Sequence, residues 1–212
     1  MDTSRSNYSP KMEEVVNKLI GAYTEAELTY VYAGATAAEH EKVYLKNFAR
    51  YFQMRAHGMN NLRNDLMRYQ IRRGGNIQLA EEHFYKYQQL KYPKKTEEMK
   101  EMMKQLTAME KNLEGLWRHF YETATTEKDH VSAQYARRWL FKHQYPEYAK
   151  MVRLSNALHQ ASCVQHFDAT FMKYEVENDE EDEDKDEDED EEEKEEKEYK
   201  KKRGLKKENE HF

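Results

Sequence analysis

The sequence predicts an all-α protein, a four-helix bundle with one long crossover connection. Seven glycines and three prolines in 212 residues are too few for a turn-rich β protein. Four long segments repeat apolar residues at alternating spacings of three and four, which is the period of an amphipathic helix. Only one of the three links between these segments is long. Together these observations favour four helices around a single core.

The first two helices are predicted over 11–39 and from about residue 44 to a pair of glycines. The first helix has one stripe of mostly apolar residues: Met12, Val16, Leu19, Tyr23, Ala26 and Tyr30. The second has a similar stripe: Tyr44, Phe48, Tyr51, Arg55, Met59, Leu62, Leu66 and Tyr69. Gly74 and Gly75 follow this stripe and are typical of a helix C-cap.

The third helix is predicted to begin at Thr96 as N-cap, because acidic residues follow it directly. Its stripe is Met99, Met102, Leu106, Met109, Leu113, Leu116 and Phe120. The fourth helix is predicted over 130–161, and Pro146 inside it should kink it. A short fifth helix at 163–174 completes the body.

The connections predict how the helices are arranged. Short links at 40–42 and around 123–129 join antiparallel neighbours, whereas the link at 76–95 has about 20 residues. That length fits a crossover along helices of about 40 to 48 Å, which lets the second and third helices lie parallel. We therefore expect an N-terminal extension at 1–10, one helical domain at 11–174 and a tail at 175–212.

The net charge of −6 conceals a strong asymmetry along the chain. Residues 175–198 hold 19 acids and three lysines, a net charge of −16, whereas 1–174 carries +6. Almost no apolar residue lies in the acidic segment, so we expect it to be disordered. Three roles stay open for it: a solubilising brush, a cation binder or a mask for basic partners. The basic run YKKKRGLKK at 199–207 resembles a nuclear localisation signal.

The expected compartment is cytoplasmic, with a nuclear location as a second possibility. Cys163 is the only cysteine, so no intramolecular disulfide can form and a reducing environment is favoured. No apolar run is long enough for a membrane span, so we expect no membrane partner. The RGG at 73–75 sits at a predicted helix end, and nucleic acid is not an expected partner.

Five stretches, in this order around the crossover, resemble ferritin over about 10–174. They are ELTYVY (27–32), LKNFARYF (45–52), RRGGNI (72–77), MEKNL (109–113) and RRWLFKHQ (137–144). The resemblance implies a ferritin-like four-helix bundle with iron, Fe2+ or Fe3+, as the bound metal. It also implies a homo- or hetero-oligomer with ferritin subunits, a 24-subunit cage, and places the aromatic segment 83–92 at a two-fold contact.

Ferritins oxidise Fe(II) at a di-iron site inside the bundle. The resemblance implies that the residual metal ligands here are Glu25, Tyr32, Glu110 and Gln144. The second helix should supply a bridging Glu and a His, but Met59 and Leu62 occupy those positions. No catalytic residue is therefore assigned, and two interpretations of the remaining acids stay open. They hold a weak metal site, or they form a polar plug in the core.

By the same resemblance, this chain lacks the acidic residues of two further features with which ferritins handle iron. The second-helix glutamates that seed mineral correspond to Gly58, Asn61 and Asn64, and the acids of the three-fold channel correspond to Gln134 and Arg137. The sequence thus predicts a divergent ferritin subunit of an intracellular iron-storage cage without efficient ferroxidase activity. The alternative is a ferritin-derived scaffold or chaperone-like protein that no longer handles iron. Restoring the two ligands with Met59→Glu and Leu62→His should then restore some activity.

Overall fold

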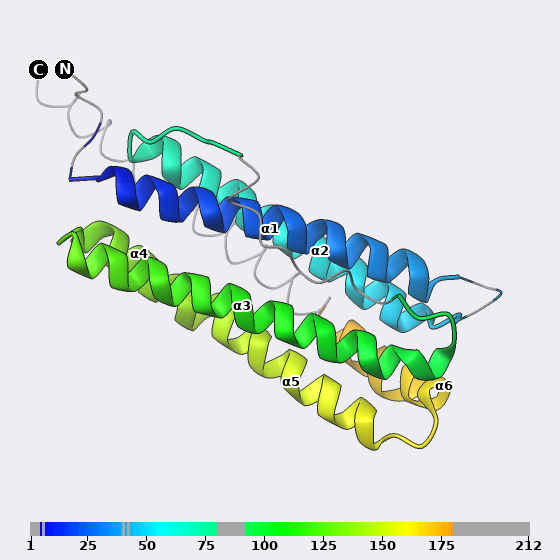
Figure 1. Ribbon diagram of the computed structural model, residues 1–212. Helices are drawn as coiled ribbons and strands as arrows, with labels where there is room; N and C mark the ends of the chain where they lie inside the picture. Colours follow the sequence, from blue (N-terminus) through cyan, green and yellow to red (C-terminus); the bar gives the residue numbers. More distant parts are fainter. Residues whose placement is uncertain (1–4, 6, 40, 42, 80–91, 180–212) are drawn as a thin grey trace, which may run out of the picture.

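The computed structural model describes residues 5, 7–39, 41, 43–79 and 92–179, and these residues form helices and no strands (Figure 1). The predicted all-α bundle is confirmed, with α1 packed beside α2 and α3 beside both α4 and α5. The second and third helices run parallel, as the long crossover predicted. The main helices are α1 (Pro10–Ala37), α2 (Lys46–Arg72), α3 (Met99–Thr126), α4 (His130–Trp139) and α5 (Tyr145–Gln160).

Local sequence signals account for the ends of the first two helices. The Ser9 hydroxyl accepts a hydrogen bond from the Met12 amide at the start of α1, and Pro10 occupies the first turn. At the end of α2, Gly74 has a φ of 76°, a left-handed conformation that glycine adopts without strain. The Gly74 and Gly75 amides donate to the carbonyls of Ile71 and Gln70. The predicted glycine cap is therefore confirmed.

The third and fourth helices differ from the prediction in detail. Thr96 begins a short 3₁₀ turn rather than capping α3, and its hydroxyl donates to the carbonyl of Val43 at 3.4 Å. The predicted fourth helix is divided, because the π-helical turn Leu140–Gln144 separates α4 from α5. Pro146 lies in the first turn of α5, where its missing N–H breaks the regular α-helical hydrogen-bond pattern.

The C-terminal helix fastens the end of the body to the start of α2. It comprises α6 (Val164–Phe167), the π-turn η4 (Asp168–Met172) and further helical residues to 179, five beyond the predicted end of the bundle at 174. Asp168 accepts a hydrogen bond from the Phe48 amide at 2.8 Å and one from the Asn47 side chain at 3.3 Å. No side chain of its own caps α2, so Asp168 serves as the cap from a distant helix.

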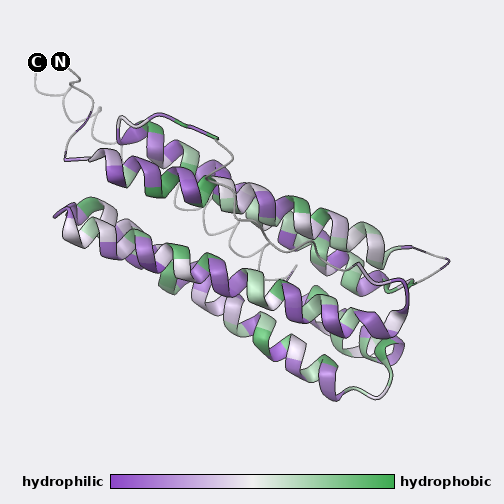
Figure 2. Cartoon of the chain, in the orientation of Figure 1, coloured by the Kyte–Doolittle hydropathy of each residue, from purple (hydrophilic) through white to green (hydrophobic). Residues whose placement is uncertain are grey.

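One core runs through the whole bundle. Apolar and hydrophilic residues alternate along each helix in Figure 2, as expected for amphipathic helices. The largest fully buried side chains are aromatic: Trp117, Tyr23, Tyr30, Tyr51, Phe48, Phe52 and Phe120. Residues 80–91 and 180–212 lie outside the described residues, and with them most of the predicted contact segment 83–92 and the acidic tail expected to be disordered.

The cap from Asp168 can be tested by substitution. Asp168→Ala removes an acceptor for the α2 N-terminus, so we expect the free energy of unfolding to fall by about 1 to 2 kcal/mol. Urea unfolding followed by circular dichroism measures the change. Glu122→Ala, an exposed acid of α3, is the matched control and should change stability by less than about 0.5 kcal/mol.

Candidate functional site

A network of polar side chains lies in the middle of the bundle, centred on Glu110 of α3. Glu110 is completely buried and accepts hydrogen bonds on both carboxylate oxygens. Its Oε1 accepts from the Tyr30 hydroxyl at 2.6 Å and from the Arg55 guanidinium at 2.7 Å. Its Oε2 accepts from the Gln144 amide at 3.0 Å. Three helices and the π-turn thus meet at one carboxylate.

Arg55 of α2 is the cation of this network. Its side chain is only 12% exposed, and its Nη1 lies 2.7 Å from Oε2 of Glu147 on α5. Burial acts to lower the pKa of Arg55, but the carboxylates of Glu147 and Glu110 outweigh burial and raise the pKa well above its ordinary value. The guanidinium is therefore a permanent positive charge held between two acids.

Tyr30 and Tyr23 extend the network along α1. Burial raises the pKa of Tyr30 well above its ordinary value, and the charge of Glu110 adds to this effect, so the phenol stays protonated and donates. Tyr23 lies seven residues, about two helical turns, before Tyr30. Its hydroxyl donates to Gln144 Oε1 at 2.7 Å and accepts from the Trp117 indole at 2.7 Å. The two phenols, the indole and the Gln144 amide thus have partners, whereas Nε of Arg55 and Oε2 of Glu147 are buried without a hydrogen bond.

The structure brings together two of the four predicted ligands. Glu110 and Gln144 are adjacent, as described above. Tyr32 is 60% exposed, and its ring contacts Tyr92 at a centroid distance of 6.1 Å. Glu25 lies about 200° around α1 from Tyr23, at 100° per residue, and is half-buried with its Oε2 atom enclosed. The interior phenol is Tyr30, two residues before the predicted one.

A family model described as a ferritin-like domain matches residues 13–160. The chain belongs to the ferritin family. No individual curated protein matches it. Among the described residues no helix is long and apolar enough to cross a membrane.

The residues at the ferritin di-iron position do not fit two iron ions. Glu110 is surrounded by donors, and the charge that an iron ion would supply is already supplied by Arg55. Met59, at the position of the bridging acid, is 1% exposed within the apolar core. No group of three or more His, Cys, Asp or Glu side chains in the described part of the chain could hold a metal ion. The contacts of Glu110 are those of a polar plug in the core.

Arg55 is a site residue that was not predicted, although its place in the sequence indicates one. It stands on the predicted apolar stripe of the second helix, where a charged side chain needs a buried partner. Tyr23 and Tyr30 likewise stand on the apolar stripe of the first helix. The position of a polar residue on an apolar stripe would therefore have identified the network.

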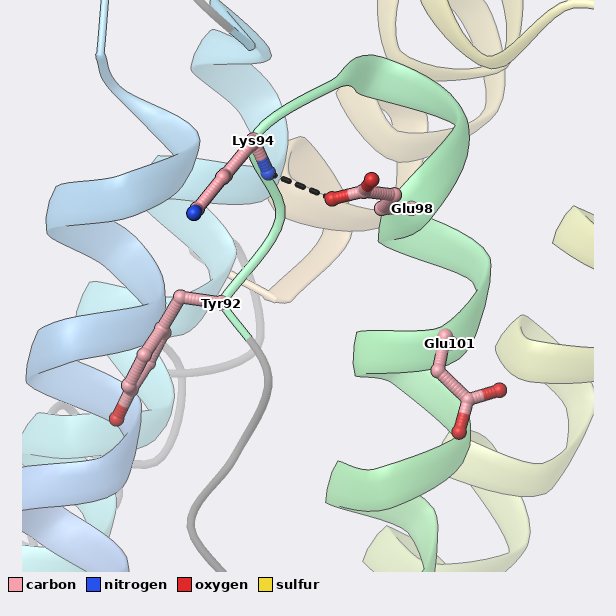
Figure 3. A pocket seen from close by; sticks show the side chains of 4 residues that line it. All are labelled: Tyr92, Lys94, Glu98 and Glu101. Carbon is pink, nitrogen blue, oxygen red and sulfur yellow. Dashed lines mark hydrogen bonds between the residues drawn. The ribbon is translucent and has the colours of Figure 1, made fainter.

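Apart from the network, a hollow of about 660 Å³ lies beside the start of α3 (Figure 3). Tyr92, Lys94, Glu98 and Glu101 line it. Glu98 already accepts a hydrogen bond from the Lys94 amide at 2.8 Å, which leaves one acid and no imidazole among these lining residues. The described residues of this lining alone supply no group of three metal-binding side chains.

The network predicts strong coupling between Arg55 and Glu110. Arg55→Met leaves the Glu110 charge buried beside fewer donors, so we expect a loss of about 3 to 5 kcal/mol in the free energy of unfolding. Adding Glu110→Gln removes that charge and should recover at least half of the loss. Urea unfolding of both single variants and the double variant measures the coupling. If the losses in free energy of unfolding of the two single variants add up to that of the double variant, the two side chains are not coupled and the network is contradicted.

Proposed function

We propose that the protein is a ferritin-family subunit that contributes to an iron-storage assembly without oxidising iron itself. One observation carries the proposal: the Arg55 guanidinium lies between Glu110 and Glu147 at the place where ferritins hold iron. A fixed cation there repels Fe(II) and occupies the carboxylate that would bind it. Both oxygens of Glu110 have donors without a metal ion, which suits a structural subunit.

An exposed apolar surface on α1 supports assembly. Leu28, Val31 and Tyr32 are 54%, 48% and 60% exposed and lie on one side of the helix, next to Tyr92. Contiguous exposed apolar residues are typical of surfaces that are buried between proteins. We propose homo- or hetero-assembly with ferritin subunits, as a 24-subunit cage by resemblance, in the cytoplasm.

Iron retention, in this proposal, depends on the acidic segment. Residues 175–198 carry a net charge of −16, and closely spaced carboxylates supply several oxygens to one hard cation. The alternative function is a scaffold that no longer handles iron. One observation favours that alternative: apart from the interior Arg55, α2 contains five basic residues and one acid, so its surface does not attract iron ions.

The position of Arg55 lowers the activity that we expect from restoring the two missing ligands. Fe(II) oxidation by the natural chain should stay at the buffer blank, measured as the initial rise of Fe(III)-oxo absorbance in air. Met59→Glu with Leu62→His should restore little, because Arg55 lies one helical turn from position 59 and would pair with the new acid. Adding Arg55→Leu removes the competing cation and should raise the rate above that of the double variant.

Arg55→Leu alone is the control for this experiment, since it frees Glu110 without adding ligands and should remain inactive. Circular dichroism should show a folded bundle for every variant compared. Rapid oxidation by the natural chain, abolished by Glu110→Ala, would overturn the proposal.

Truncation tests whether the tail retains iron. The cut belongs after Asp179, because Glu175 and Val176 are buried against the bundle. Removing 180–212 should lower the iron loaded per assembly without changing the particle mass found by light scattering. Equal loading with and without the tail would contradict the storage role, and monomers alone at micromolar concentration would contradict assembly of this chain by itself.

A further inference from the structure

The exposed face of α2 is basic from one end of the helix to the other. At 100° per residue, its exposed residues Lys46, Arg50, His57, Arg68 and Arg72 fall within an arc of about 80°. We call these five residues the α2 basic face, within which Arg68 forms an ion pair with Asp65 of the same helix. The basic face is about 39 Å long from first to last residue.

α3 has a basic stripe of its own within about 40°: Lys100, Lys104, Lys111 and Arg118. Arg118 pairs with Glu114, and Lys100 donates to backbone carbonyls at the end of α5. The C-terminal helix packs on α2, so α2 is the basic surface beside the start of the acidic segment.

The C-terminal helix reaches the first turn of this face. A hollow of about 320 Å³ lies between the two helices, lined by Lys46 and Arg50 from α2 and by Lys173 and Glu177 from the C-terminal helix, among others. Three of these four side chains are cationic. The fourth, Glu177, lies 3.7 Å from the Lys173 ammonium, so the hollow keeps a net positive charge beside the start of α2.

The acidic segment begins to pair with the bundle before the described residues end. Glu175 forms two hydrogen bonds with the Arg153 guanidinium, at 2.8 and 2.7 Å, and Asp179 forms an ion pair with Lys150. Arg153 holds the pKa of Glu175 below its ordinary value through this hydrogen bonding. The first acids of the segment thus contact cations of α5, on the other side of the C-terminal helix.

The helix also points the segment along α2. Asp168 contacts the backbone of Asn47 and Phe48, whereas Asp179 contacts Lys150, whose ammonium lies 5.6 Å from the centroid of the Tyr51 ring. The chain therefore advances from the first turn of α2 towards its second as it leaves the bundle. Residues 180–198 can span about 60 Å when extended, which exceeds the length of the basic face.

We propose that residues 180–198 dock within the same chain along the α2 basic face. The two charge patterns are complementary, the start of the segment is already paired with the bundle, and its direction follows α2. Each exposed pair contributes little by itself, but the covalent connection gives the segment a high effective concentration at this surface. The docking goes beyond the iron-storage proposal and holds whether or not the assembly stores iron.

Carbodiimide cross-linking of the full chain tests the docking, because it forms an amide between a lysine amine and a carboxylate in contact. Arg68→Lys keeps the charge and adds an amine near the far end of the basic face. We expect tail peptides attached to Lys46 and to position 68, with yields about fivefold higher in 50 mM than in 500 mM salt. Lys104 and Lys111, exposed on α3, are the matched control amines.

Charge reversal supplies the second measurement. Arg50→Glu with Arg72→Glu should reduce the tail adducts to the control level, whereas Lys104→Glu with Lys111→Glu should leave them unchanged. A mixture of ¹⁴N- and ¹⁵N-labelled chains separates links within a chain from links between chains. Equal yields on α3, salt-independent yields, or links mainly between chains would each overturn docking within the chain.

Discussion

The ion pair between Arg55 and Glu110 is the constraint around which the bundle is arranged. Removing a guanidinium and a carboxylate from water is costly, and the structure offsets this cost with Glu147, Tyr30 and Gln144. Each partner comes from a different element, so the helices must keep one register for all the contacts to form. A metal-dependent bundle obtains the same cross-linking from its ions, whereas this chain obtains it from a side chain of its own.

The π-turn before α5 takes part in the same arrangement. Gln144 ends that turn and Glu147 lies in the first turn of α5, three residues later and therefore on the same side. Pro146 stands between them and cannot donate a backbone hydrogen bond, so an irregular turn costs less here than in an uninterrupted helix. A wide turn at this position lets the amide contact Glu110 while the acid contacts Arg55.

The sequence predicts the bundle well because the spacing of apolar residues reports directly which face of a helix is buried. Glu110 and Gln144 come instead from the family resemblance, and the structure places their side chains in contact. The resemblance does not predict the phenol, because matching short stretches to a family chose Tyr32 although the apolar stripe already contained Tyr30. Helical spacing is the stronger physical argument here, as a side chain about 200° around the helix cannot reach the same partner. The hydrogen-bond partners of Arg55 depend on long-range packing and require the three-dimensional structure.

Charge in this chain is separated by element, which bears on how such a subunit could act on iron. By the family resemblance, α2 would carry acids both inside the bundle and on its surface, but here it carries Arg55 inside and a basic face outside. The densest negative charge stands instead in residues 175–198, with 19 of the 41 acids of the chain. A cation therefore finds no attraction from α2 alone. Pairing of the acidic segment with basic side chains reduces the charge that this segment has available to bind cations.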